Sequence, residues 1–291
     1  MRRQTIGSYF QIILQLGKAR ISLPVALSSL TGYALQMGTV GLEGLYLGIG
    51  VFLISCSSGA INHLQEHKID KKMPRTQNRP IPSGKISPLL ASLVVLLYFV
   101  SGAAILIIHF PPAALIASTV TLISYNGFYT PLKKYTAFAV VPGSLVGALP
   151  PYIGWLATGG DLFSPIIFWV AVFFFIGQIP HFWLLLLMFG KEYKLVGYPS
   201  LTDIFSENQI KRLSYTWILS TIAAALIIAF KIMISKVVII ILLTYIFYVL
   251  ISTSSQLLLK HNLQVRGTFF KLNFLYLFMM IAIIVDSILF R

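Results

Sequence analysis

The chain has 291 residues, of which 57% are hydrophobic and 10% are charged, and its formal net charge is +14. Soluble domains carry roughly a quarter charged residues, so this composition excludes an ordinary soluble protein and predicts an all-α, polytopic membrane protein. The basic residues lie between apolar runs, which membrane topology explains without a nucleic-acid partner. The single cysteine, Cys56, excludes an intramolecular disulfide and a cysteine metal cluster.

Nine apolar stretches are each long enough to cross a bilayer, which takes about 20 residues of helix. They cover residues 21–38, 43–62, 88–109, 112–130, 137–157, 164–189, 212–231, 236–257 and 271–290. Prolines lie in or beside several spans, so we expect bent helices around a cavity, within one domain over residues 1–291. Residues 1–20 are basic and moderately apolar, which indicates a segment along the membrane surface.

Lys and Arg residues are distributed unevenly between the connections. If the N-terminus lies in the cytoplasm, all but three of the 22 fall on the cytoplasmic side, and the exceptions are Lys231, Lys236 and Arg291. Cytoplasmic loops of membrane proteins carry an excess of Lys and Arg. The pattern therefore predicts a multi-pass protein of the cytoplasmic membrane, with a cytoplasmic N-terminus and a C-terminus on the opposite side.

Polar chemistry is concentrated between Asn62 and Lys85, where 24 residues hold two carboxylates, six Lys or Arg residues and two histidines. Asn62, Glu66 and Asp70 are spaced i, i+4, i+8, so they share one face if the helix of the second span continues. Mg²⁺ typically takes one or two carboxylates and completes its shell with water and substrate phosphates. We expect a magnesium and diphosphate site at the cytoplasmic edge of this helix.

Arg75 and Arg79 follow four residues apart and are candidate clamps for the anion that the metal would hold. A charged connection between spans is usually only a solvated loop. Two observations favour a site: the chain has only eight carboxylates, and Glu66 and Asp70 both lie on one helical face beside these bases.

A second group of polar residues follows the fourth and sixth spans. Glu192 is the only carboxylate at the inner end of the sixth span, and an ionisable residue there is a functional candidate. His181 lies on the same span, where a hydrogen-bonded core histidine is the alternative to a ligand. Tyr129 and Lys133, four residues apart, could contact a leaving phosphate, or the lysine could simply mark the inner face.

The sequence contains no P-loop, no GxSxG elbow and no Cys/His zinc pattern. Diphosphate, Mg²⁺ and an apolar cavity together favour an allylic isoprenoid diphosphate as substrate. Metal and basic groups would stabilise the departing diphosphate, and aromatic side chains would shield the allylic cation from water. The chain has 21 Phe, 14 Tyr and 4 Trp residues to supply such a wall.

Six motifs resemble the UbiA superfamily of intramembrane prenyltransferases. They are LGKARIS at 16–22, NxxxExxxDxxMxRTxxRP at 62–80, YTPLKKYT at 129–136, GALPPYIGWLATGG at 147–160, PHFW at 180–183 and EYKLVGYPSL at 192–201. The resemblance implies the fold of that superfamily, nine transmembrane helices around a central cavity open to the cytoplasmic side.

Within the superfamily, the PPYIGW, PHF and MxRTxxRP blocks most resemble the heme branch, which farnesylates protoheme IX to give heme O. This implies farnesyl diphosphate and heme b as substrates, two Mg²⁺ ions as cofactors and the lipid bilayer as the setting. A heme A synthase or a terminal oxidase assembly protein is an expected partner. Glu66 stands where the superfamily usually has Asp, and Val196 replaces a carboxylate of the second acidic motif, as in the heme branch.

The resemblance also implies roles for individual residues. Glu66, Asp70 and Glu192 would be catalytic as Mg²⁺ ligands, and Asn62 would support them. The expected diphosphate contacts are the bases Arg20, Arg75, Arg79 and the catalytic Lys133, together with the hydroxyl of Tyr129. His181 would contact heme or orient another residue.

Two alternatives stay open at this point. A related enzyme could prenylate an aromatic quinone precursor, although the missing second acidic pair argues against it. A transporter or cation channel could use the acidic residues as an ion path. For that class we expect carboxylates near the membrane midplane and inverted repeats, whereas these carboxylates lie at inner helix ends.

Overall fold

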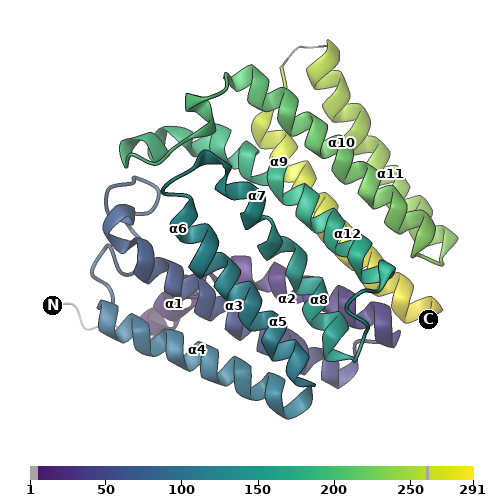
Figure 1. Ribbon diagram of the computed structural model, residues 1–291, viewed down its shortest axis with the longest axis horizontal. Coiled ribbons are helices and arrows are strands. Elements are labelled where there is room, and N and C mark those ends of the chain that lie inside the picture. The colour runs from purple at the N-terminus through teal and green to yellow at the C-terminus, as the bar shows by residue number, and fades with distance from the viewer. Residues whose placement is uncertain (1–5, 260–261) are drawn as a thin grey trace.

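The computed structural model describes residues 6–259 and 262–291, and regular structure within them is entirely helical. The helices are α1 (Ile6–Leu16), α2 (Ala19–Met37), α3 (Gly41–Asp70), α4 (Pro88–His109), α5 (Pro112–Ile123), α6 (Thr130–Leu132), α7 (Val140–Gly143), α8 (Leu145–Ala157), α9 (Pro165–Leu195), α10 (Glu207–Lys231), α11 (Lys236–Ser254) and α12 (Val265–Phe290). The long helices lie roughly side by side, with α3 to α5 on one side, α9 to α12 on the other and α8 between them (Figure 1).

Seven helical segments of the described residues are long and apolar enough to cross a membrane, which confirms a multi-pass protein. They are α3, α4, the segment Ala137–Ala157, α9, α10, Lys236–Leu258 and α12. Each coincides with one of the nine predicted spans. The other two predicted spans, 21–38 and 112–130, correspond to α2 and to α5 with the turn that follows it.

These two segments differ from the seven for separate physical reasons. Helix α2 has 19 residues but buries several hydroxyl side chains, among them Ser22, Ser29 and Thr31, which bond to backbone carbonyls close by in the chain. Helix α5 has only 12 residues, because the chain then changes to a π-helical turn, η1 (Ser124–Tyr129). The turn ends in α6, whose second residue is Pro131.

Helix α3 continues past its predicted span to Asp70, which confirms the expectation that the helix carries Asn62, Glu66 and Asp70. The predicted span 137–157 is instead interrupted. It begins with a short 3₁₀ turn, η2 (Ala137–Ala139), and continues as α7 and α8 on either side of Ser144. Proline removes a backbone donor, so the prolines of this segment favour such breaks.

Two glycines let α2 and α8 touch through their backbones. A Cβ atom added to Gly32 would collide with the carbonyl oxygen of Pro151, and one added to Gly154 would collide with the carbonyl oxygen of Ser29. Small residues allow helices in a membrane to approach closely and gain van der Waals contact. The pair thus fixes α8 between the two sides of the bundle.

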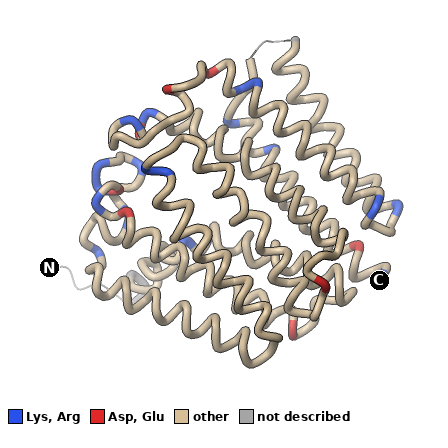
Figure 2. The backbone as a smooth tube through the Cα atoms, in the orientation of Figure 1, with Lys and Arg blue, Asp and Glu red and all other residues tan. Residues whose placement is uncertain are grey.

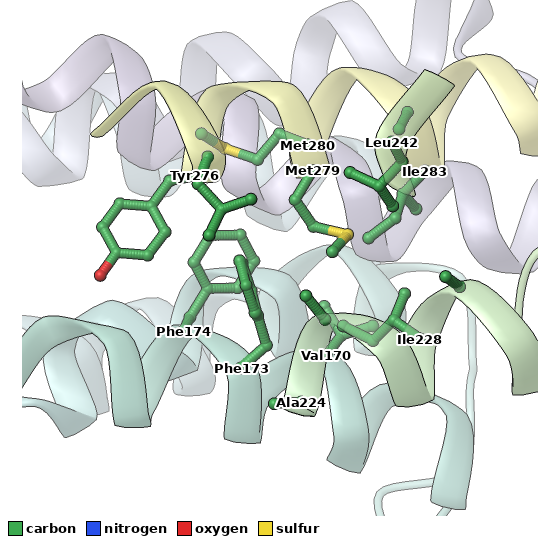
Figure 3. Packing of buried hydrophobic residues seen from close by; sticks show 14 of the residues in the cluster. Val170, Phe173, Phe174, Ala224, Ile228, Leu242, Tyr276, Met279, Met280 and Ile283 are labelled. Atoms are coloured by element: carbon green, nitrogen blue, oxygen red, sulfur yellow. The ribbon is translucent and has the colours of Figure 1, made fainter. Parts of the chain in front are cut away.

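The largest apolar core joins α9, α10, α11 and α12. Figure 3 shows Phe173 and Phe174 of α9 beside Tyr276 and Met279 of α12. The rings of Phe173 and Tyr276 lie 5.8 Å apart at 79°, the edge-to-face geometry that aromatic pairs favour. This packing anchors the helix whose far end carries Glu192.

A buried carboxylate joins α12 to the start of α11, at the end of the α9–α12 group opposite Glu192. Asp286 of α12 is 2% exposed and accepts backbone N–H groups of Ile234 and Ser235, at 3.0 and 2.7 Å, where α11 begins. Unpaired N–H groups at a helix N-terminus favour such an acceptor. Figure 2 shows the charged residues mostly at the two ends of the bundle, with few between.

Replacing Gly154 by Ala should lower the free energy of unfolding by about 3 kcal/mol or more, because the methyl group overlaps a backbone oxygen that cannot rotate away. Thermal unfolding in detergent measures the change. The matched control is Gly48→Ala in α3, where the new Cβ would meet only Leu30, at 3.8 Å. Equal stability of the two variants would contradict the close α2–α8 contact.

Candidate active site

The three polar residues predicted on one face of α3 lie on that helix, but all three are buried. Asn62, Glu66 and Asp70 are 1%, 6% and 3% exposed. The sequence predicted these carboxylates at the cytoplasmic edge of the helix. In the fold, Arg79 and Thr76 of the following connection contact Asp70, and Lys133 contacts Glu66. Burial makes charge pairing obligatory here.

Glu66 lies at the centre of an ion-pair network. Its two carboxylate oxygens accept from Lys133 Nζ at 2.7 and 2.8 Å, and Oε2 also accepts from Asn62 Nδ2 at 2.9 Å. Asn62 donates in addition to the Thr130 hydroxyl at 3.2 Å. The network ties α3 to the segment that follows α5.

The π-helical turn η1 positions this segment. Asn126, in the turn, is buried and donates to the Ser58 carbonyl at 3.0 Å, while its Oδ1 accepts from the Ser58 hydroxyl at 2.6 Å. The Gln65 side-chain amide donates to the Asn126 carbonyl at 2.9 Å. π-Helical turns are often found at functional sites. Here the turn directs Lys133 toward Glu66 of α3, while the Tyr129 ring packs beside Gly143 of α7 and Phe182 of α9. The Lys133 ammonium lies 5.6 Å from the centre of the Tyr129 ring.

Asp70 holds the connection that follows α3. Both of its carboxylate oxygens accept from Arg79 Nη1, at 2.9 and 2.7 Å, and the Thr76 hydroxyl donates to its backbone carbonyl at 3.0 Å. Arg79 therefore lies where the sequence pattern predicted a clamp. Its partner in this structure is the carboxylate.

Glu192, at the end of α9, lies beside the same connection. Its carboxylate accepts the backbone N–H of Arg75 at 3.2 Å, and the Arg75 guanidinium lies 4.7 Å from the centre of the Phe189 ring. The end of α9 and the end of α3 therefore lie at one end of the bundle. Arg75 and Arg79 do not act as a parallel pair, since one packs on α9 and the other binds Asp70.

Lys18, between α1 and α2, is a site residue that the sequence pattern did not single out. Its ammonium donates to Asn62 Oδ1 at 2.5 Å and to the Tyr125 hydroxyl at 3.4 Å. Burial, and then the charges of Arg79 and Lys133, lower the pKa of Lys18 to about 7. A signal for this residue does exist in the sequence, because the lysine lies in the LGKARIS motif.

The neighbouring Arg20, which was predicted to contact diphosphate, is exposed and has no hydrogen bond or ion pair within the described residues. The reason is conformational. Lys18 has φ 49° and ψ 45°, a left-handed conformation that turns the chain between α1 and α2, and α2 then carries Arg20 to the outside.

His181 lies in the middle of α9, and its neighbours do not include the carboxylates of the polar end. Its Nδ1 is 2.9 Å from Asn273 Oδ1 of α12, and its ring lies 4.9 Å from that of Phe269. The structure therefore brings Glu66, Asp70, Glu192 and the bases to one end of the bundle and places His181 apart from them.

The donor chemistry fits Mg²⁺, although the arrangement is not a preformed cage. No group of three or more His, Cys, Asp or Glu side chains is placed to share a metal in the ranges 6–259 and 262–291. Glu66 and Asp70 are buried oxygen donors one helical turn apart, and Mg²⁺ bound with a diphosphate needs only one or two carboxylates. Lys18, Lys133 and Arg79 lie beside these residues and would offset further negative charge of the diphosphate.

An apolar groove of about 600 Å³ lies between the start of α9 and the end of α10, and Trp169 and Phe230 are among its lining residues. It is at the opposite end of α9 from Glu192. None of the predicted site residues lines it, so the groove is separate from the polar site.

Fold and sequence together define a multi-pass membrane protein of the prenyltransferase class. Residues 25–279 match the model of the UbiA prenyltransferase family. The chain belongs to the UbiA prenyltransferase family, which confirms the resemblance carried by its motifs.

Two relatives and one solved structure define the similarity further. The chain is 34% identical to the protoheme IX farnesyltransferase of Oleidesulfovibrio alaskensis, over 92% of this chain and 94% of the relative. It is 30% identical to that of Trichodesmium erythraeum, over 99% and 89%. A UbiA homolog from Archaeoglobus fulgidus, bound to DMAPP and Mg²⁺, shares the fold with a TM-score of 0.70 at 15% identity, over 96% of this chain and 99% of that one.

Replacing Lys133 by Met should lower the free energy of unfolding by about 3 kcal/mol, because it leaves the Glu66 carboxylate buried without its main partner. Adding Glu66→Gln should restore most of the loss, since no uncompensated charge then remains. Chemical unfolding of Lys133→Met, Glu66→Gln and the double variant in detergent gives the coupling free energy between the two side chains.

Lys134→Met serves as the control for this cycle, because Lys134 is exposed. A surface change of this kind should stay within about 0.5 kcal/mol of the parent. Additive losses in the double variant would show that the Lys133–Glu66 pair does not hold these segments together.

Proposed function

We propose that the chain transfers the farnesyl group of farnesyl diphosphate to a vinyl group of protoheme IX (heme b), giving heme O. The observation that carries the reaction class is the gathering of buried carboxylates and bases at one end of an apolar bundle. The choice of acceptor rests on the relatives, which are named protoheme IX farnesyltransferases and align with most of this chain. Val196, where other members have a carboxylate, supports the heme branch over quinone-type members.

The bases of the site would bind the diphosphate. Lys18, Lys133 and Arg79 already surround Glu66 and Asp70, and Arg75 lies beside Glu192. Lysine and arginine both suit phosphate, arginine through its two-pronged geometry. Together they would stabilise the negative charge that the leaving diphosphate gains as the allylic bond breaks.

Glu66, Asp70 and Glu192 would hold Mg²⁺, directly or through water, with Asn62 orienting Glu66. Bound Mg²⁺ would add charge neutralisation on the leaving group. The carboxylates also have a role that does not depend on the metal. They keep Lys133 and Arg79 in place before the anion arrives.

Aromatic side chains beside the polar end would line the path of the prenyl chain. The ring of Tyr129 lies 5.6 Å from those of Tyr125 and Phe182. Such rings would exclude water and stabilise an allylic cation through their faces. The Tyr129 hydroxyl would donate to the departing oxygen. The heme vinyl group would attack the cation, and water would complete the new side chain.

The acceptor would lie near His181. Asn273 Oδ1 accepts from Nδ1, so the lone pair of the imidazole is on Nε2 and is available to a ligand. The ring lies among Phe182, Phe269 and Tyr276, which suits the flat, apolar face of a porphyrin.

The topology proposed with this function has nine spans in one domain over residues 1–291. Helix α2 and the segment formed by α5 and η1 would be the two spans beyond the seven apolar ones. The N-terminus would be cytoplasmic and the C-terminus on the other side, so the site would open to the cytoplasm. This topology fits a substrate whose diphosphate lies at the membrane interface and whose prenyl chain lies within the bundle.

Incubating membranes that contain this chain with Mg²⁺, farnesyl diphosphate and either heme b or 4-hydroxybenzoate tests the acceptor. We expect mass spectrometry to find heme carrying one farnesyl group and one water, and no prenylated benzoate. Product only from 4-hydroxybenzoate would shift the proposal to a quinone precursor. Absence of both products, with folded protein present, would refute prenyl transfer to either acceptor.

Asp70→Asn should reduce turnover by about 100-fold or more, because the amide cannot bind a metal as a carboxylate does. The amide oxygen can still accept from Arg79, so the fold should persist. Asp286→Asn is the matched control, since this carboxylate is equally buried at the far end of the bundle. We expect that variant to lose stability and keep its activity per folded molecule. Mg²⁺-dependent turnover retained in Asp70→Asn would contradict the proposed metal role.

A further inference from the structure

The hydroxyl of Tyr198 is buried at the polar end of the bundle and has no hydrogen-bond partner within the described residues. The residue is 8% exposed. It follows Gly197, whose φ of 73° reverses the chain just after α9. Its backbone N–H donates to the Tyr193 carbonyl at 3.0 Å, and the two rings are 6.1 Å apart.

This geometry places Tyr198 at the carboxylates. Tyr193 directly follows Glu192, whose carboxylate accepts from Arg75. Burial, and then the nearby charges of Glu66 and Asp70, raise the pKa of Tyr198, and the closeness of the Glu66 carboxylate to the phenol hydroxyl adds to this rise. The group is therefore a hydrogen-bond donor that keeps its proton at neutral pH.

A buried hydroxyl without a partner is unusual, because its hydrogen bonds to water are lost and nothing replaces them. Three basic side chains of the site, by contrast, have hydrogen-bond partners. Lys18, Lys133 and Arg79 donate to Asn62, Glu66 and Asp70 respectively. Tyr198 lies beside this network, and its hydroxyl makes no hydrogen bond within the described residues.

We propose that Tyr198 binds the substrate by donating its hydroxyl hydrogen to a diphosphate oxygen. This assignment rests on the proposed function and adds a substrate-binding residue from the connection after α9. The phenol lies near the Glu66 carboxylate without a hydrogen bond of good geometry to it, and a diphosphate bound at the carboxylates would supply the acceptor. Since no bond is broken, the residue would act on affinity for the diphosphate end of the substrate.

The test is Tyr198→Phe, which removes the hydroxyl and keeps the ring. Calorimetry on the full chain in nanodiscs measures binding of magnesium pyrophosphate and of farnesyl diphosphate. A hydrogen bond to a charged group is worth enough to raise both Kd values about ten-fold or more when it is lost. Without ligand, Tm should stay equal or rise, because an unsatisfied buried group has been removed.

Ser287→Ala is the matched control, because the Ser287 hydroxyl is also buried and without a partner among the described residues but lies near the far end of α12. We expect unchanged pyrophosphate affinity in this variant. The rise in Tm on adding magnesium pyrophosphate gives a second readout, which should shrink for Tyr198→Phe alone.

The outcomes separate this inference from the function beneath it. Unchanged Kd and unchanged ligand stabilisation in Tyr198→Phe, with tight binding by the parent, would overturn the role of Tyr198 and leave the proposed function intact. A parent chain that binds neither pyrophosphate nor farnesyl diphosphate would overturn both. A ten-fold effect shared by Ser287→Ala would show a general consequence of losing a buried hydroxyl and would also refute the assignment.

Discussion

The pairing of Glu66 with Lys133 is the interaction on which the polar end of the molecule depends. A carboxylate buried in an apolar bundle is stable only with a partner, and the partner lies on a segment 67 residues later. Asn62 completes the pair from the same helix. Because neither charge can be left alone, the end of α3 and the segment after η1 have to meet.

The same constraint gathers the remaining parts. Arg79 pairs with Asp70 and thereby holds the connection after α3 against the helix. Glu192 accepts the backbone N–H of Arg75 in the same connection. The packed core of α9 to α12 supports this arrangement by fixing the helix that carries Glu192 (Figure 3). Between the two sides, the glycine contact of α2 and α8 sets their separation. Electrostatics thus determines where the ends meet, and apolar packing determines how firmly they are held.

Much of the fold could be predicted from hydropathy, because membrane spans are long apolar helices and the end of α3 keeps a strict four-residue spacing. The parts that could not be predicted depend on contacts between distant residues. The π-helical turn follows from Asn126 bonding to Ser58 and Gln65, some 60 residues earlier. His181 pairs with Asn273 across 92 residues. Burial of Asp70 depends on a connection that reads as a solvated loop, and the choice of Lys18 over Arg20 depends on a backbone angle that no periodicity reveals.

Lys18 combines an unfavourable left-handed backbone conformation with a side chain that contributes to the polar site. It is the single non-glycine residue with positive φ in the described ranges, and such a conformation costs roughly 1 kcal/mol for a residue with a side chain. Glycine would relax the turn between α1 and α2 but would remove the ammonium beside Asn62. A substitution that raises stability at this position would therefore remove the ammonium that the proposed diphosphate site uses, so selection for stability alone would act against the proposed chemistry.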